Sequence, residues 1–537
     1  MNKKFLSFIA LAIAIVMVLS ACTPSAPPAA DTTPADQPAA TTTDADTPAQ
    51  PAETPHADDD ADIINLTMLF SENPHFPPHD GWVVPREWRN QWGVEIEFMT
   101  VPGVDHASRR SVLLGTGQGP DIVQVPDRHS EFALNGVFLP INEYLHLMPN
   151  LSALLNRFPE DAANLYELDG NLYILPWVHM YGVFDTGLAI RIDILEELNL
   201  DVPTTMDEFY DVLVAMQEAY PDSTPFTGFI PFINQLAWFG RSWDFTHMWG
   251  GFPVNFNYDE GIYESAATHY RFREMLRFMN RLYEADLMDP EIFTQNSDPW
   301  TPKLSTGSSF ASFAWTDQLP AIIYTGQQEV RPEFYMNIIF PKGSNEADWH
   351  FIFRHLLPGY TLSSRLADHP QIDRIMAFMD WWLYSEEGAI LTNWGVEGET
   401  FEVVDGQRQF TQRLLDSPAG APRQAQIDYG LFVANLMGIW ATDRYGAYAG
   451  PVATEQAAQL NQMGRFRPGP PSPMLDLDEM EHMATIAAPI IDTVERAREA
   501  FITGAMSLDD DWDAYVADLY NRGMQTIVDM HNSGIGR

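Results

Sequence analysis

Strand and helix patterns alternate where the foldable part of the chain begins, and this order restricts the fold more than any other feature. Residues 63–70 and 94–101 carry the apolar and alternating patterns of strands, and residues 121–125 carry a third, short one. Apolar residues with helical spacing lie between them, at 82–92 and 106–114. The resulting β-α-β-α-β order predicts an α/β fold with a mainly parallel sheet.

A parallel sheet also predicts where a ligand would bind, because ligands lie beyond the carboxyl ends of the strands. Glu72 follows the first strand, and Asp127 follows the third. Their carboxylates can accept hydrogen bonds from hydroxyl groups. We therefore expect both residues at a binding cleft. For each acid taken alone, an ordinary solvated loop residue is the more common case.

The later sequence is mostly helical and suggests a second lobe. Helical patterns occur at 192–198, from Thr204 onward, and at 270–284, 371–384, 483–501 and 511–522, with a strand at 310–315. We expect two lobes, each formed by two separated segments. The first lobe would contain residues 62–180 and 306–360, and the second would contain residues 181–305 and 361–537.

The N-terminus has the pattern of a bacterial lipoprotein. Lys3 and Lys4 precede an apolar stretch at 5–19, and the only cysteine of the chain, Cys22, ends the sequence L-S-A-C. Residues 1–21 are therefore predicted to be a signal peptide, and Cys22 the lipidated first residue of the mature protein. The alternative is an uncleaved membrane anchor with an incidental cysteine. Residues 22–61, rich in Pro, Ala, Thr and Asp, predict a disordered tether.

The charge of the chain excludes one large class of function. The chain has 74 Asp and Glu against 30 Lys and Arg, a formal charge of −44, whereas nucleic-acid binding requires a basic surface. Only four lysines occur, so nearly all of the positive charge is arginine. This composition fits a surface adapted to an alkaline or saline exterior, and it fits equally a coding bias with solubilising acids.

Motifs for catalysis, metals and cofactors are absent or poorly placed. One cysteine excludes a disulfide framework and a cysteine-ligated cluster. The glycine-rich stretch at 115–119 precedes a strand, whereas a dinucleotide loop must follow one. His75 and His79 are separated by two prolines that prevent a helix aligning them as metal ligands. We expect no cofactor, no metal and no catalytic residue.

Tryptophan is the most informative residue type for a ligand. The chain has 15 tryptophans, and indole offers a broad apolar face that suits the C–H face of a sugar ring, together with one N–H donor. Several lie among polar residues in predicted loops. The predicted ligand-binding residues are Trp82, Trp177, Trp238, Arg241, Trp243, Trp315, Asp317 and Trp394, in addition to Glu72 and Asp127. Ordinary packing in the core is the alternative for each tryptophan.

Several sequence blocks resemble one family. The stretch G-T-G-Q-G-P-D-I-V (115–123), the stretch from G-L-A-I-R to V-P-T-T-M-D-E-F (187–209) and the stretch W-W-L-Y-S-E-E-G-A-I-L-T-N-W-G (381–395) are similar to extracellular solute-binding proteins of ABC importers. The closest likeness is to the long, oligosaccharide-binding branch of sugar-binding family 1. Some members carry an acidic calcium loop, but the corresponding residues 220–228 lack its alternating oxygen ligands.

The resemblance implies a two-lobed, type II periplasmic-binding-protein-like fold, in which each lobe is a mainly parallel sheet flanked by helices and a hinge lies between the lobes. It implies a monomeric receptor that binds a carbohydrate, expected to be an oligosaccharide, and delivers it to the transmembrane subunits of an ABC permease. The receptor would be attached by Cys22 to the outer face of the cytoplasmic membrane. The alternatives are a lipid-anchored polysaccharide-degrading enzyme and a receptor for a peptide or another polar solute.

Overall fold

The computed structural model describes residues 63–72, 77–126, 129–180, 186–229, 239–245, 253–315, 318–343, 351–416, 422–431, 433, 436–440, 462, 464 and 466–536. The predicted signal peptide, Cys22 and the tether lie outside these residues. Within the described part, no helix has both the length and the apolar character that crossing a membrane requires.

The first lobe contains a six-stranded sheet in the order β15-β4-β12-β3-β1-β2. Its strands are β1 (Ile64–Glu72), β2 (Val94–Pro102), β3 (Ile122–Gln124), β4 (Leu175–His179), β12 (Leu356–Leu362) and β15 (Ile439–Trp440). β12 is antiparallel to both of its neighbours, β3 and β4, and the other three pairings are parallel. Five strands therefore run in one direction, and their carboxyl ends meet at the same edge of the sheet.

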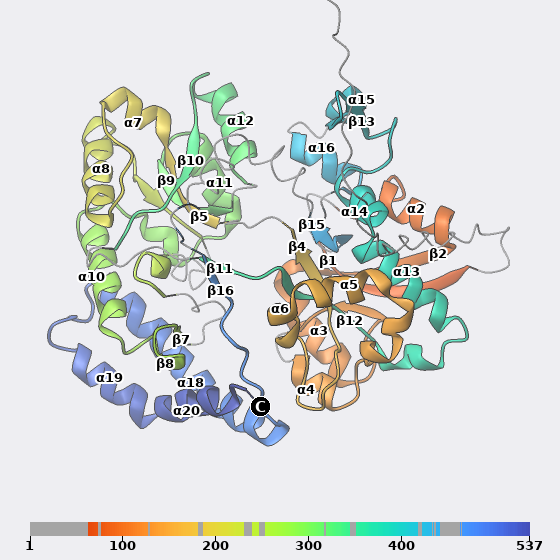
Figure 1. The fold of residues 1–537 in the computed structure, drawn as a ribbon. Coiled ribbons are helices and arrows are strands. Elements are labelled where there is room, and N and C mark those ends of the chain that lie inside the picture. The colour runs from red at the N-terminus through yellow and green to blue at the C-terminus, as the bar shows by residue number, and fades with distance from the viewer. Residues whose placement is uncertain are drawn as a thin grey trace, which may run out of the picture. The chain divides into compact units, whose positions relative to one another are not determined.

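Helices cover both faces of this sheet (Figure 1). They are α2 (Val83–Trp92), α3 (His106–Gly115), α4 (His129–Leu134), α5 (Pro149–Arg157), α6 (Pro159–Ala163), α13 (Ile372–Tyr384) and α14 (Glu386–Asn393). The alternation of β1 explains the two layers, because Met68 packs in the core that contains α2 and α13, whereas Leu69 packs with Leu113 of α3. Trp88 and Trp382 join α2 to α13, with ring centroids 4.5 Å apart.

The second lobe contains a four-stranded sheet in the order β10-β5-β9-β6. Its strands are β5 (Thr186–Arg191), β6 (Phe226–Thr227), β9 (Ala311–Trp315) and β10 (Met336–Ile339). β5 is antiparallel to β9 and β10, and only β6 and β9 are parallel. The predicted α/β class is confirmed, but the expectation of a mainly parallel sheet in each lobe is wrong for this one.

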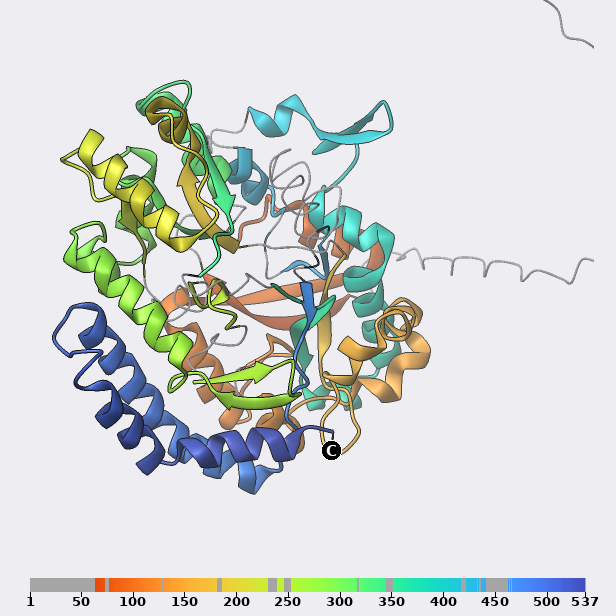
Figure 2. The same ribbon diagram turned by 60° about the vertical axis from the view of Figure 1, so that its left-hand side comes forward.

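The second lobe is rich in helices, as predicted. They are α7 (Ile192–Leu198), α8 (Met206–Ala219), α10 (Tyr270–Glu284), α11 (Ser297–Ser305), α12 (Leu319–Glu329), α18 (Leu477–Ile502), α19 (Trp512–Asn521) and α20 (Met524–Gly534). Thr205 and Glu208 form the capping box that starts α8. Figures 1 and 2 show α18 beside α10, and residues of both helices share one core.

The expected division of the chain between the lobes is wrong for several elements after residue 305. Residues 306–360 were assigned to the first lobe, but β9 and β10 pair with β5 of the second. Residues 361–537 were assigned to the second lobe, but α13 packs in the core of the first, and β15 pairs with β4. A strand or helix pattern shows which residues are buried. The sheet or core that buries them depends on contacts with residues distant in sequence.

A proline-rich segment connects the two lobes. β11 (Phe351–Phe353) pairs with β16 (Phe466–Pro468) in a short parallel pair. After β16, Pro471 O accepts a 2.8 Å hydrogen bond from Tyr263 Oη of the second lobe. The backbone N–H of Ser472 donates to Asn164 Oδ1 of the first lobe at 2.8 Å. Residues 466–472 therefore bond to both lobes.

The remaining described elements are short or peripheral. They are β7 (Val254–Asn257), β8 (Ile262–Ser265), β13 (Phe401–Val404), β14 (Gln407–Phe410), α15 (Gln412–Leu415), α16 (Pro422–Asp428), and the 3-10 helices η1 (Gly103–Asp105), η2 (Ile141–Leu147), η4 (Pro290–Phe293) and η5 (Ser364–Asp368). β7 and β8 form a hairpin whose buried residues join the core of the second lobe.

Candidate functional site

Three partly buried aromatic residues lie at the carboxyl edge of the first sheet. Trp177 and His179 are on β4, two residues apart, so both side chains point to the same face. Trp440, the last residue of β15, pairs with His179 in the register of the two strands. The rings of His179 and Trp440 stack with centroids 5.2 Å apart and an interplanar angle of 28°. We call these three residues the aromatic edge.

The aromatic edge is electrically neutral at the pH of most external media. Burial lowers the pKa of His179 to about 4, so its imidazole is uncharged above that pH and stacks as a flat neutral ring. Trp177 lies edge-on to the ring of Tyr360, with centroids 5.9 Å apart and an interplanar angle of 86°. The edge therefore consists of flat, uncharged aromatic rings, which suit the apolar face of a sugar ring.

Of the predicted binding residues, Trp177 thus lies on β4, two residues before the strand ends. Glu72 lies at the same edge, as the last residue of β1, and Trp315 ends β9 in the second lobe; the structure describes only their backbone. Arg241 is partly buried in the second lobe, near Trp243. Asp127, Trp238, Asp317 and Cys22 lie outside the described residues.

Three predicted binding tryptophans are instead packed in the cores. Trp82 is 2% exposed and lies between Phe70 and Phe98. Trp243 is completely buried beside Phe278. Trp394 is 2% exposed and stacks on Phe410, with centroids 4.9 Å apart. These rings have no face left for a ligand, so we correct their assignment from binding to packing.

Gly395 shows why Trp394 was misassigned. A glycine directly after a tryptophan allows a ligand or another part of the chain to approach closely. Gly395 has φ +88°, and a Cβ there would lie 2.2 Å from Thr400 Oγ1. The Thr400 hydroxyl donates a 2.8 Å hydrogen bond to the Trp394 carbonyl. The close approach exists, but it is made by a side chain of the same lobe.

His179 and Trp440 were missed by the sequence analysis. Trp440 ends β15, a strand of only two residues that follows Gly438. A strand of this length is too short to give a periodic pattern in the sequence. A search for tryptophan directly after a short apolar stretch that begins with glycine would have selected it.

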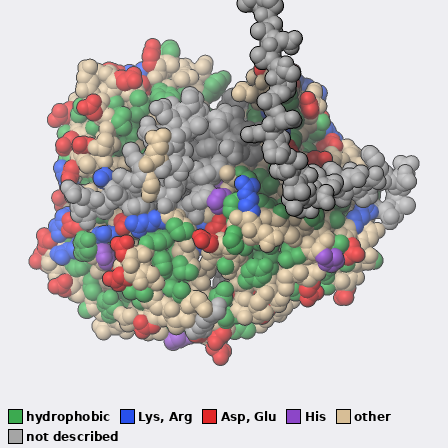
Figure 3. All heavy atoms as spheres, in the orientation of Figure 1, with side chains coloured by type: hydrophobic (Ala, Val, Ile, Leu, Met, Phe, Trp, Pro, Cys, Tyr) green, Lys and Arg blue, Asp and Glu red, His purple; other side chains and the backbone are tan. Residues whose placement is uncertain are grey.

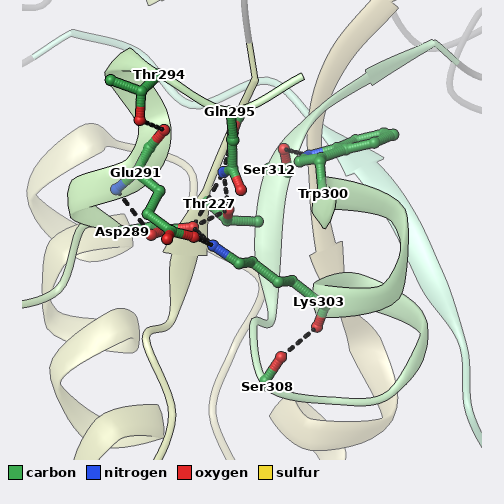
Figure 4. A network of polar contacts seen from close by, with 10 residues as sticks. Thr227, Asp289, Glu291, Thr294, Gln295, Trp300, Lys303, Ser308 and Ser312 are labelled. Carbon is green, nitrogen blue, oxygen red and sulfur yellow. Dashed lines mark hydrogen bonds and ion pairs between the residues drawn. The ribbon is translucent and has the colours of Figure 1, made fainter. Parts of the chain in front are cut away.

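A partly buried ion pair lies in the second lobe, near the end of β6 (Figure 4), and joins the buried Asp289 to the half-buried Lys303. Lys303 Nζ is 2.7 Å from Asp289 Oδ2, and Thr227 Oγ1 donates to the same oxygen at 2.7 Å. Gln295 Nε2 donates to both Thr227 Oγ1 and Asp289 Oδ2, each at 3.0 Å. Burial favours a higher pKa for Asp289, but the bonds from Lys303 and Thr227 outweigh it, and the pKa is lowered. This network fixes Thr227, the last residue of β6.

Basic side chains elsewhere lie beside acidic ones, as the face in Figure 3 shows. On α10, Arg271 pairs with Asp244 at 3.0 Å, and Arg277 pairs with Asp509 at 2.8 Å. Among the described residues, no group of three or more His, Cys, Asp or Glu could hold a metal ion.

Comparison with known proteins gives consistent matches. A family model described as bacterial extracellular solute-binding protein matches residues 89–394, more than half of the chain. Lipoprotein LipO of Bacillus subtilis (strain 168) is 24% identical over 334 residues, which are 58% of this chain and 63% of LipO, so the match spans slightly less than two thirds of that relative.

Two further matches cover more of the chain. The fructooligosaccharide ABC transporter substrate-binding protein FusA of Streptococcus pneumoniae serotype 4 is 21% identical over 500 residues, 86% of this chain and 88% of FusA. The crystal structure of the alginate-binding protein AlgQ2 without calcium ion superposes with a TM-score of 0.73 at 21% identity, covering 89% of this chain and 99% of AlgQ2. The structural match to AlgQ2 confirms the expected two-lobed fold.

Proposed function

Because the chain belongs to the bacterial extracellular solute-binding protein family, we propose that it is a receptor that captures a carbohydrate at the aromatic edge and delivers it to an ABC permease. The observation that carries this proposal is the half-buried stack of Trp440 on His179, beside Trp177. Flat neutral rings at the carboxyl ends of parallel strands suit the apolar faces of sugar rings. The match to FusA, a fructooligosaccharide-binding protein, supports an oligosaccharide as the ligand.

Replacing Trp177 or Trp440 by alanine is expected to weaken oligosaccharide binding by about 1–4 kcal/mol each, the range of aromatic hot spots. The physical reason is the loss of a flat apolar face against the ligand. Isothermal calorimetry with neutral and acidic oligosaccharides measures the effect. Trp440→Phe is the matched control, because it keeps an aromatic face and should retain most of the affinity.

The same experiment separates the alternatives. Saturable binding without products supports a receptor, whereas shortened oligosaccharides would support a degrading enzyme. Binding of peptides but of no sugar would move the ligand to another class. Unchanged affinity in both alanine variants would contradict the assignment of the site to the aromatic edge.

We also propose that the receptor is attached to the outer face of the cytoplasmic membrane through a lipid on Cys22, and that the permease recognises the liganded receptor. Cys22→Ser is expected to release the protein or to leave an uncleaved precursor, because the thiol that carries the lipid is lost. Fractionation and intact-mass measurement of both forms check this. A variant that was processed and membrane-attached like the wild type would contradict the anchor.

A further inference from the structure

β15 is only two residues long, but its backbone is fixed by bonds from four different elements. The carbonyl groups of residues 436–439 each accept one hydrogen bond. The donors are Trp382 Nε1 of α13 to Leu436 O at 2.9 Å, Tyr360 Oη of β12 to Met437 O at 3.0 Å, Val178 N of β4 to Gly438 O at 2.8 Å, and Asn393 Nδ2 of α14 to Ile439 O at 2.9 Å. The backbone that precedes Trp440 is therefore fixed by hydrogen bonds at four successive carbonyl groups.

Gly438 brings β15 directly against the backbone of α13. A Cβ at this position would lie 2.1 Å from Leu383 O, so only glycine permits this approach. The side chains of Tyr360, Trp382 and Asn393 are completely buried. Buried polar groups that bond to one short segment restrict it more than a two-residue strand pairing could.

Tyr360 has a special place among these donors, because it contacts Trp177 of the aromatic edge as well as the segment that precedes Trp440. Its hydroxyl holds the segment that leads to Trp440, and its ring lies edge-on to Trp177. We propose that Tyr360 is a positioning residue that sets Trp177 and Trp440 in the geometry that binds the ligand. This inference rests on the proposed function, since it requires that the aromatic edge contacts the ligand.

Tyr360→Phe tests the inference with the smallest possible change, the loss of one hydroxyl group. Ligand affinity is expected to fall about three- to tenfold, as for the loss of one buried hydrogen bond. Tyr515→Phe is the matched control. Tyr515 is a buried tyrosine of the second lobe whose hydroxyl donates to Ala267 O at 3.2 Å, and its replacement should leave affinity unchanged.

A double-mutant cycle separates positioning from general stability. If Tyr360 acts through Trp177 and Trp440, Tyr360→Phe should cause no further loss of affinity in a background that carries both Trp177→Ala and Trp440→Ala. A further loss in that background as large as the loss in the wild type would overturn the inference.

A measurement without ligand keeps the inference testable if the proposed function fails. The protein is labelled with 5-fluorotryptophan, and the fluorine resonances of Trp177 and Trp440 are assigned with Trp→Phe variants. Tyr360→Phe should shift both resonances, and Tyr515→Phe should shift neither. Asn393→Ala, which removes the bond to Ile439 O, should also shift the Trp440 resonance. Unchanged resonances in Tyr360→Phe would overturn the inference whatever the ligand is.

Discussion

Replacing Trp394 by alanine is expected to lower the free energy of unfolding by about 3–5 kcal/mol, the usual cost of removing a large aromatic side chain from a core. Trp394 is 2% exposed, stacks on Phe410 and lies 6.2 Å from Phe401 between ring centroids. The folded variant should bind its ligand with unchanged affinity. Thermal or urea unfolding and calorimetric binding on the same preparation measure both quantities.

Trp440→Ala is the natural comparison, because it should give the opposite pattern. Trp440 is only partly buried at the edge of its sheet, so its removal should cost affinity and little stability. If Trp394→Ala lost affinity while its unfolding transition stayed in place, Trp394 would return to the ligand site.

The second large effect is expected at the partly buried ion pair of the second lobe. Lys303→Met leaves the carboxylate of Asp289, which is 4% exposed, without its cation. We expect a loss of about 2 to 3 kcal/mol in the free energy of unfolding, at or below the low end of the range for a fully buried pair, because the Lys303 side chain is 24% exposed. Arg522→Met is the matched control. It breaks a pair of the same 2.7 Å length whose side chains are 38% and 45% exposed, and it should cost no more than about 0.5 kcal/mol.

The pH dependence of this effect has a definite sign. The pKa of Asp289 is lowered in the folded protein, so the pair stabilises the fold above the ordinary carboxyl pKa of about 4. That contribution is lost as the pH falls through the lowered folded pKa. The difference between wild type and Lys303→Met should therefore be full at pH 7 and shrink below about pH 4. A difference that grew on acidification would contradict the assigned pair.

The sequence predicted the local elements well. The bounds of α7 and α10 agree with their apolar periodicity, and the Thr-x-x-Glu pattern gave the start of α8 because its capping box forms. These features depend on neighbours within a few residues. The sheet to which β9 belongs was not predictable in this way. The five residues of β9 are apolar enough to be buried in either lobe.

The site was predicted less well, for a related reason. A tryptophan among polar residues can lie at a cleft or in a core. The sequence does not show whether its ring packs against a ligand or against other side chains of the protein. Trp177 is partly buried on β4, whereas Trp394 fills the space beside Phe410. Trp440 gave no signal, because its position depends on Tyr360, Trp382 and Asn393, which are 47 to 80 residues away in the sequence.

The place of β12 in the first sheet determines when that sheet can form. β12 lies between β3 and β4, so these two strands stay unjoined until residues 356–362 have been synthesised, after the whole second sheet. β15 is added later still, from residues 439–440. Pairings between segments so distant in sequence make folding slow. We therefore expect the nascent chain to stay without a complete first sheet for most of its synthesis, a state that suits export as an unfolded polypeptide.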